Sequence, residues 1–183
     1  MKNLIAAVLL LVVGSAQAAA VFTMVESGGD VVLSGAGSID LTGLTFANTV
    51  STAGNPFVNP GLPNFRTGDT TFHNLDVYSG LTGPAAFGSG GMFPGTGGSG
   101  DVFGVRGATA LYVPEGYVSG SPLAGTGVWA GATFVSMGVA AGTYVWSWSG
   151  DSITLNVIPI PAAVWLFGSA LAGLGWMRRK QTV

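Results

Sequence analysis

The sequence predicts an all-β domain, an antiparallel β-sandwich or jelly-roll-like fold, followed by a single C-terminal transmembrane helix. Short segments between residues 21 and 157 alternate apolar and polar residues with the period of two that strands require. Gly, Pro and Asn separate these segments, as in turns. Residues 162–177 form an apolar run without a charge. The chain therefore divides into residues 1–18, residues 19–156 and residues 157–183.

The N-terminus has the order of parts found in a secretory signal peptide. Lys2 precedes an apolar stretch at residues 4–13, and Ala16 and Ala18 supply the small residues of a cleavage site. An uncleaved N-terminal anchor is the alternative, and the short apolar stretch followed by small residues disfavours it. We expect signal peptidase to cut after Ala18, with a cut after Ala19 or Ala20 as the alternative, and the following domain to be exported.

The first strands of the domain are expected at residues 21–25 and 31–33. Between them Ser27, Gly28, Gly29 and Asp30 give the composition of a hairpin loop. A further strand is expected at residues 38–42, because Ile39 and Leu41 alternate with polar residues.

The middle of the domain predicts further short strands by the same alternation. They are expected at residues 70–78, 101–105, 109–113 and 131–136. Residues 84–100 are rich in Gly and Ser and predict a loop.

The clearest hairpin is at the end of the domain. Tyr144, Trp146 and Trp148 share one face of a strand over residues 143–149, and core packing is the favoured role for that face. Gly150 and Asp151 permit a reversal, and residues 152–157 alternate again.

The C-terminal segment has the features of a membrane tether. As a helix, residues 162–177 would extend about 24 Å, against roughly 30 Å for the apolar core of a bilayer. The basic end formed by Arg178, Arg179 and Lys180 should stay in the cytoplasm. Pro159 and Pro161 precede the run and are poor helix formers.

This tail resembles the PEP-CTERM family of bacterial sorting signals, above all its VPLPA-type variant. The resemblance rests on Pro159, Ile160, Pro161 and Ala162, then on the apolar run with small residues, then on the basic end at residues 178–180. Ile158 stands where the variant has Val, and Ile160 where it has Leu. The resemblance implies recognition by an exosortase, a membrane protease that cuts near the proline motif, in a Gram-negative host that makes exopolysaccharide. No biochemical activity follows from it.

The net charge of the exported part limits the classes of partner that it can bind. All eight acidic residues lie there, against two bases, Arg66 and Arg106, so its formal net charge is −6. Nucleic-acid binding needs a basic surface and is therefore disfavoured. There is no cysteine to form a disulfide. An outer-membrane barrel also fits alternating strands, but a basic-ended apolar C-terminal helix is foreign to that class.

Catalytic and metal-binding signals are sparse. His73 is the sole histidine, and no Gly-x-Ser-x-Gly motif marks a nucleophile, so a hydrolase site is not indicated. Zinc is disfavoured without Cys or further His, whereas calcium remains open at Asp69, Asp76 and Asp101, which lie within two residues of Gly or Asn.

A glycan-binding surface is the remaining hypothesis for a site. Tyr112, Tyr117 and Trp129 lie in turn-rich segments and would form a sugar-stacking platform if they are exposed.

The sequence as a whole predicts a non-enzymatic, exported protein with no cofactor, structural or adhesive at the cell surface or in an extracellular matrix such as a biofilm. It would pass through an intermediate tethered to the inner membrane. Alternatives are a glycan-binding module, a glycan-active hydrolase with two converging acids, and a permanently anchored envelope protein.

Overall fold

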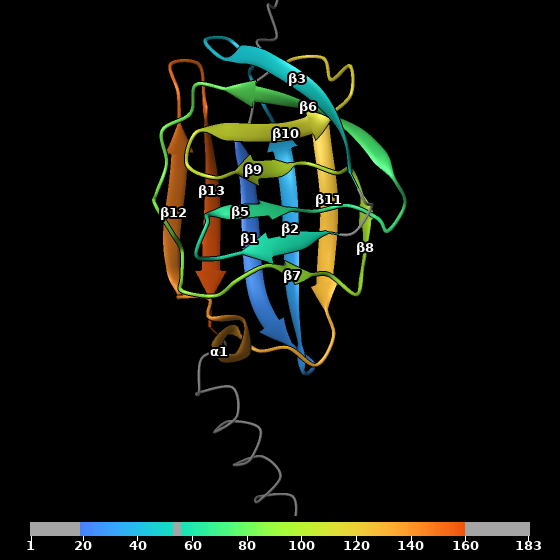
Figure 1. Ribbon diagram of the computed structural model, residues 1–183, viewed down its shortest axis with the longest axis vertical. Helices are drawn as coiled ribbons and strands as arrows, with labels where there is room; N and C mark the ends of the chain where they lie inside the picture. Colours follow the sequence, from blue (N-terminus) through green and yellow to red (C-terminus); the bar gives the residue numbers. More distant parts are fainter. Residues whose placement is uncertain (1–18, 53–55, 160–183) are drawn as a thin grey trace, which may run out of the picture.

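The computed structural model describes residues 19–52 and 56–159, and these build two β-sheets (Figure 1). The six-stranded sheet has the order β12 (Gly142–Ser147), β13 (Ser152–Ile158), β1 (Ala20–Ser27), β2 (Asp30–Ser38), β11 (Pro122–Trp129), β8 (Gly97–Gly100). The seven-stranded sheet has the order β3 (Thr45–Thr52), β6 (His73–Ser79), β10 (Ala110–Pro114), β9 (Gly104–Arg106), β5 (Asn64–Arg66), β4 (Phe57–Asn59), β7 (Phe93–Pro94).

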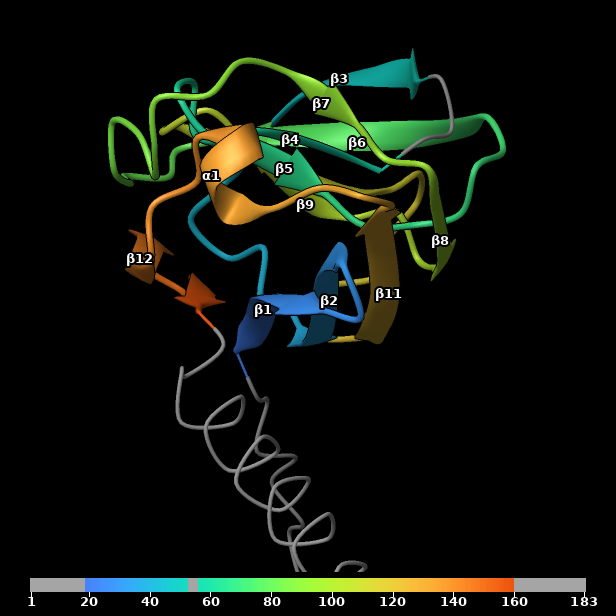
Figure 2. The ribbon, with the colours of Figure 1, turned by 90° about the horizontal axis from the view of Figure 1, so that it is seen from below.

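The two sheets form two layers, as Figure 2 shows from below. In Figure 1 the strands of the seven-stranded sheet run across those of the six-stranded sheet behind them, which is a crossed rather than an aligned arrangement. Strand pairs within the described residues are antiparallel except for β1 and β13, which are parallel. The expectation of a mostly antiparallel all-β domain is confirmed.

Aromatic side chains join the two layers in the core. The ring centroid of Phe22 lies 4.9 Å from that of Phe65 and 4.8 Å from that of Phe103. The ring centroids of Phe65 and Trp146 are 5.5 Å apart. All four side chains are fully buried. The indole N–H of Trp146 donates to the carbonyl of Gly107 at 3.0 Å, so its one polar group is satisfied inside the core.

The two predicted hairpins are present. Gly28 and Gly29 form the two-residue turn between β1 and β2, with φ values of 64° and 92° that suit a type I′ turn and favour glycine. In the last hairpin, β12 pairs with β13, and Trp146 and its neighbours Tyr144 and Trp148 pack against the core. The core role expected for this aromatic face is confirmed.

The strand expected at residues 38–42 is not formed beyond Ser38, where β2 ends. Ile39 is buried, but side chains take the next main-chain donors: Asp151 accepts from the N–H of Asp40 at 3.0 Å and Ser119 accepts from that of Leu41 at 2.9 Å. Those donors are therefore not available to a neighbouring strand.

The strand expected at residues 131–136 is instead a helical turn, α1 (Phe134–Met137). Thr133 and Ser136 form a reciprocal capping box at its start, and Gly138 ends it with a φ of 61°. The loop expected at residues 84–100 includes two short strands, β7 and β8.

The first and last strands of the domain run side by side in the same direction. Ala20 pairs with Ile153 and Val25 pairs with Ile158, so the chain enters this strand pair at one end and leaves it at the other. In Figure 1, β13 ends near α1. The described part of the chain has no helix of the length and apolar character needed to cross a bilayer, and residues 162–177 lie outside it.

Candidate functional site

The proline motif of the tail follows directly on the last strand. β13 ends at Ile158, and Pro159 is exposed immediately after it. A proline has no N–H to donate to a ladder, so the pairing of β13 ends where the motif begins. Ile160, Pro161 and Ala162 lie outside the described residues, as do Arg178, Arg179 and Lys180 and the cleavage-site residues Ala16 and Ala18.

The sole histidine belongs to a local network on the surface. The Nε2 atom of His73 lies 2.7 Å from Oδ1 of Asp69 and 2.9 Å from Oγ1 of Thr71. The same Oδ1 accepts hydrogen bonds from the N–H and the hydroxyl of Thr71 at 2.8 and 2.7 Å. The hydrogen bond from His73, followed by those from Thr71, lowers the pKa of the Asp69 carboxyl to about 2.

This network does not have the geometry of a catalytic triad. A triad uses one ring nitrogen of the histidine for the nucleophile and the other for the carboxylate. Here Thr71 and Asp69 both face Nε2 of His73. All three residues also lie within five positions at the start of β6, so the network stabilises the approach to that strand.

The three calcium candidates lie in separate places. Asp69 accepts the bonds just described. Asp76 is buried, and its oxygens accept from Oγ1 of Thr49 at 2.6 Å and from the N–H of Gly116 at 2.9 Å. Asp101 accepts from the N–H of Ala124 at 2.8 Å. In residues 19–52 and 56–159, no three His, Cys, Asp or Glu side chains gather in a metal-binding group.

The aromatic platform considered for glycans lacks the exposure it requires. Trp129 is 3% exposed, and its indole N–H donates to the carbonyl of Phe93 at 2.9 Å. Tyr112 is 7% exposed. Tyr117 is half-buried and packs against the core. Trp129 and Tyr112 therefore lie in the interior, and Tyr117 is partly covered by the segment around Ile39.

A cation–aromatic stack on the seven-stranded sheet was not indicated by the sequence. The guanidinium of Arg66 lies 4.4 Å from the ring centroid of Phe57 and 6.0 Å from that of Tyr112, and Arg106 lies 5.9 Å from Tyr112. Burial lowers the pKa of the Arg66 guanidinium.

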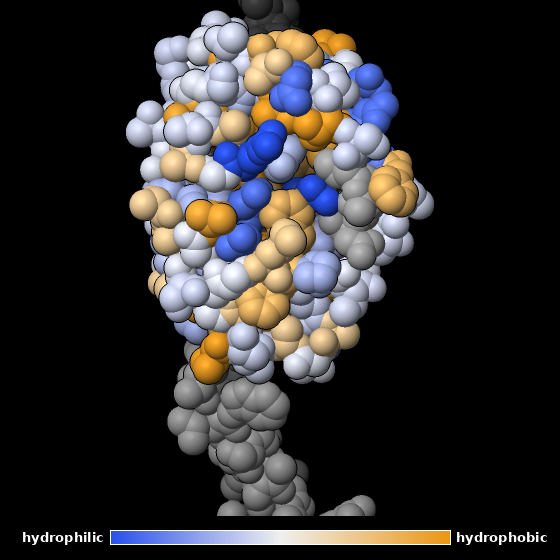
Figure 3. Space-filling view, viewed as in Figure 1, coloured by the Kyte–Doolittle hydropathy of each residue, from blue (hydrophilic) through white to orange (hydrophobic). Residues whose placement is uncertain are grey.

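Hydrophilic and hydrophobic residues are interspersed on the face of the molecule seen in Figure 3.

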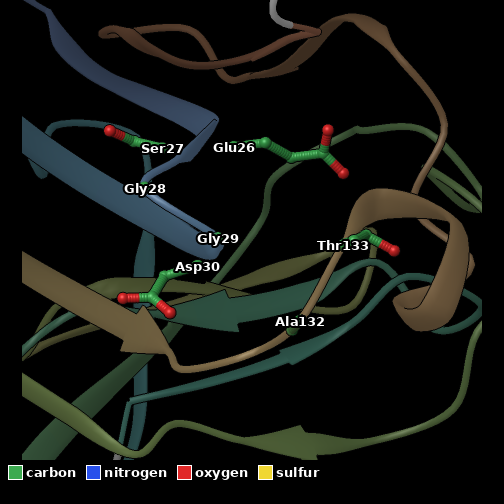
Figure 4. A pocket seen from close by; sticks show the side chains of 7 residues that line it. All are labelled: Glu26, Ser27, Gly28, Gly29, Asp30, Ala132 and Thr133. Atoms are coloured by element: carbon green, nitrogen blue, oxygen red, sulfur yellow. The ribbon is translucent and has the colours of Figure 1, made fainter.

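A pocket of about 280 Å³ lies beside the turn between β1 and β2. Its lining residues are Glu26, Ser27, Gly28, Gly29, Asp30, Ala132 and Thr133 (Figure 4). Glu26 accepts a hydrogen bond from the N–H of Phe134, and Asp30 accepts one from that of Gly131 at 2.9 Å. The two carboxylates point in different directions in Figure 4; Glu26 holds the first residue of α1, and Asp30 holds the loop before it.

Among the described residues, the junction between β13 and Pro159 is the feature that bears most directly on the expected sorting signal, because the folded domain ends there. Comparisons of the chain with protein-family models, with curated proteins and with solved structures gave no match.

Proposed function

We propose that this chain is an exported, non-enzymatic protein of the cell surface or extracellular matrix, sorted through an exosortase-type C-terminal signal. Its role is structural or adhesive, in exopolysaccharide or a biofilm. The observation that carries the proposal is the position of Pro159, directly after the last residue of β13. A cut within or beyond residues 159–162 removes the tail and leaves every described strand in place.

The mechanism belongs to the tail. Residues 162–177 halt export as a transmembrane helix, and the basic end at residues 178–180 stays on the cytoplasmic side. Pro159, Ile160 and Pro161 are then held at the outer face of the inner membrane, within a few residues of the helix. The residue before a proline favours extended backbone, the form in which many partners bind a peptide segment.

In the proposal, the β-domain is a jelly-roll-like sandwich, and cleavage of the tail releases it from the membrane. Its negative charge suits release into solvent, because copies with a net charge of −6 repel one another at long range. The glycan-active hydrolase receives no support from the pocket beside α1, since Glu26 and Asp30 do not converge and each is bonded to main chain. The alternative of a permanently anchored envelope protein differs from the proposal in one respect: the tail is not cut.

The test is the mass of the mature protein in a Gram-negative host, with and without an exosortase-type protease. We expect an N-terminus at Ala19, and in the presence of the protease a C-terminus near residues 159–162, with the domain outside the inner membrane. Intact-mass spectrometry of the membrane and extracellular fractions gives both ends. A C-terminus at Val183 in every fraction refutes processing and leaves the permanent anchor.

A matched pair of variants assigns the signal to the motif. Replacing both Pro159 and Pro161 by Ala should retain the full-length chain in the membrane. Pro122→Ala changes an exposed proline at the start of β11 and should be processed like the wild type. Equal processing of the motif variant and the control would remove the proline motif from the proposal.

A further inference from the structure

The two arginines of the β-domain lie on the same face of the seven-stranded sheet, the face turned away from the six-stranded sheet. Arg66 on β5, Arg106 on β9 and Tyr112 on β10 each adjoin a residue that is buried in the main core, so their own side chains point the opposite way. The strand register places Gly104 between Arg66 and Tyr112, and Arg106 follows two residues later on β9. This is the face seen in Figures 1 and 3.

Both guanidinium groups approach the ring of Tyr112. The guanidinium carbon of Arg66 lies 6.0 Å from the ring centroid and that of Arg106 lies 5.9 Å from it, so the two cations are at most about 12 Å apart. Like charges repel, and the attraction of each cation to the aromatic ring opposes that repulsion. The positive potential of an otherwise acidic domain is therefore concentrated at this ring.

The two arginines differ in what they can offer a ligand. Arg66 is 8% exposed, so its charge acts from within the protein, where salt screens it less than at the surface. Arg106 is exposed, and its guanidinium forms no hydrogen bond or ion pair with residues 19–52 or 56–159. Its planar set of N–H donors fits the two oxygens of a carboxylate.

Asn64 has a polar atom without a partner beside these arginines. Its Oδ1 atom is buried and accepts no hydrogen bond within the described part of the chain. The register that pairs Arg66 with Gly104, continued by one residue on each strand, brings Asn64 opposite Arg106 on the same face. A buried acceptor without a donor destabilises a fold, so this atom calls for an explanation other than folding. A hydroxyl group of a ligand would supply the missing donor.

We infer that this face binds a sugar that carries a carboxylate, such as a uronic acid unit of an acidic polysaccharide. The carboxylate pairs with Arg106 and is attracted by Arg66, and a sugar hydroxyl donates to Oδ1 of Asn64. The combination of an anion and a neighbouring hydroxyl is what selects a sugar acid. A phosphate carries about −1.5 to −2 charges, so an acidic domain repels it more strongly than a carboxylate.

The inference deepens the proposed role in exopolysaccharide and rests on it, because the domain meets such a polymer only after export. Tyr112 holds the arginines here and does not stack on the sugar, in keeping with its burial. The net charge of −6 repels an acidic polymer at a distance, so a single contact is weak. A polymer with repeated carboxylates binds many displayed copies at once and gains affinity by multivalency.

The test is retention of the mature full-length chain, in mild non-ionic detergent at low salt, on immobilised polygalacturonate. The wild type should be retained, and the methyl-esterified polymer, which has the same sugar without the charge, should not retain it. Arg106→Gln should weaken the apparent affinity roughly fivefold, as expected for loss of an exposed ion pair. Ser34→Glu makes the same change in net charge at an exposed position of the other sheet and should bind like the wild type.

A second variant separates binding from folding. Asn64→Leu removes the buried acceptor without a partner, so the midpoint of thermal unfolding should stay the same or rise. The affinity for polygalacturonate should nevertheless fall, because the sugar hydroxyl loses its acceptor. A lower midpoint with unchanged affinity would show that Asn64 serves the fold and would overturn the site as described.

Three further outcomes would overturn the inference. They are no retention of the wild type, equal affinity of Arg106→Gln and Ser34→Glu, and equal retention on the esterified polymer. Each of them leaves the sorting proposal standing, since the mass of the mature chain tests that proposal at the tail. Conversely, a C-terminus at Val183 in every fraction refutes processing and leaves the binding measurement unaffected.

Discussion

The hydroxyl of Tyr117 lies between the main-chain groups of Ile39 and those of its own loop. It accepts a hydrogen bond from the N–H of Ile39 at 3.0 Å and lies 2.6 Å from the carbonyl oxygen of Ser121, to which it donates. Ile39 is fully buried and is the first residue after β2. One phenol group thus fixes the point at which the chain leaves the six-stranded sheet.

Tyr117→Phe should destabilise the domain by about 1–2 kcal/mol, because it leaves the N–H of Ile39 without its acceptor in a partly buried place. Urea unfolding monitored by tryptophan fluorescence measures the change. Tyr144→Phe is the matched control, since the Tyr144 hydroxyl donates to the carbonyl of Ala140 at an exposed site. Equal losses for the two variants would contradict the role given to Tyr117.

Gly35→Ala should destabilise the domain by roughly 1–3 kcal/mol through overpacking. A Cβ atom at Gly35 would overlap the ring of Phe22 and lie 3.0 Å from Cζ of Phe103. Both rings are fully buried, so they can move only by displacing their neighbours in the core. Gly97→Ala is the control, because a Cβ atom there meets nothing within 4 Å. Thermal unfolding should show a lower midpoint for Gly35→Ala and little change for Gly97→Ala.

Acid should weaken the domain partly through Asp69. The pKa of its carboxyl is about 2 in the folded domain, below the ordinary aspartate value of 3.8. The stabilisation is therefore complete above the unfolded pKa and is lost as the pH falls through about 2. The difference in urea midpoint between wild type and Asp69→Asn should shrink between about pH 5 and pH 2. A difference that stays constant over that range would show that the ionised carboxylate is not the cause.

Local signals in the sequence were sufficient for the two hairpins. Gly28 and Gly29 define a turn by themselves, and the aromatic alternation around Trp146 defines both a strand and its buried face. Neither feature requires knowledge of a distant partner. The helical turn α1 was missed because its capping box uses Ser136 where Glu or Gln is the usual signal.

The strand β11 was missed for a different physical reason. Gly125 and Gly127 take the two middle inward positions, so the apolar alternation between Leu123 and Trp129 is interrupted. The structure explains the glycines: a Cβ atom at Gly125 would overlap the carbonyl oxygen of Asp101 and lie 2.7 Å from Oγ1 of Thr67. Main chain from another segment occupies the space of a side chain, and a single sequence does not reveal such an approach.

The burial of the aromatic residues considered for glycan binding could not be predicted from sequence either, because segments distant in the chain pack against them. The indole N–H of Trp129 donates a hydrogen bond to the carbonyl of Phe93. The hydroxyl of Tyr117 bonds to the main chain of Ile39, which lies 78 positions away. The turn-rich composition around these residues describes their neighbours in the chain and not their neighbours in space.

The parallel pairing of β1 and β13 has a mechanical consequence. Because the chain enters this pair at Ala20 and leaves it at Ile158, at opposite ends of the same ladder, a force applied to the two termini slides one strand along the other. All the hydrogen bonds of the ladder then bear the load together, whereas an antiparallel terminal pair would open one bond at a time. A domain pulled from its two ends would therefore resist tension, which the proposed structural role in a matrix requires.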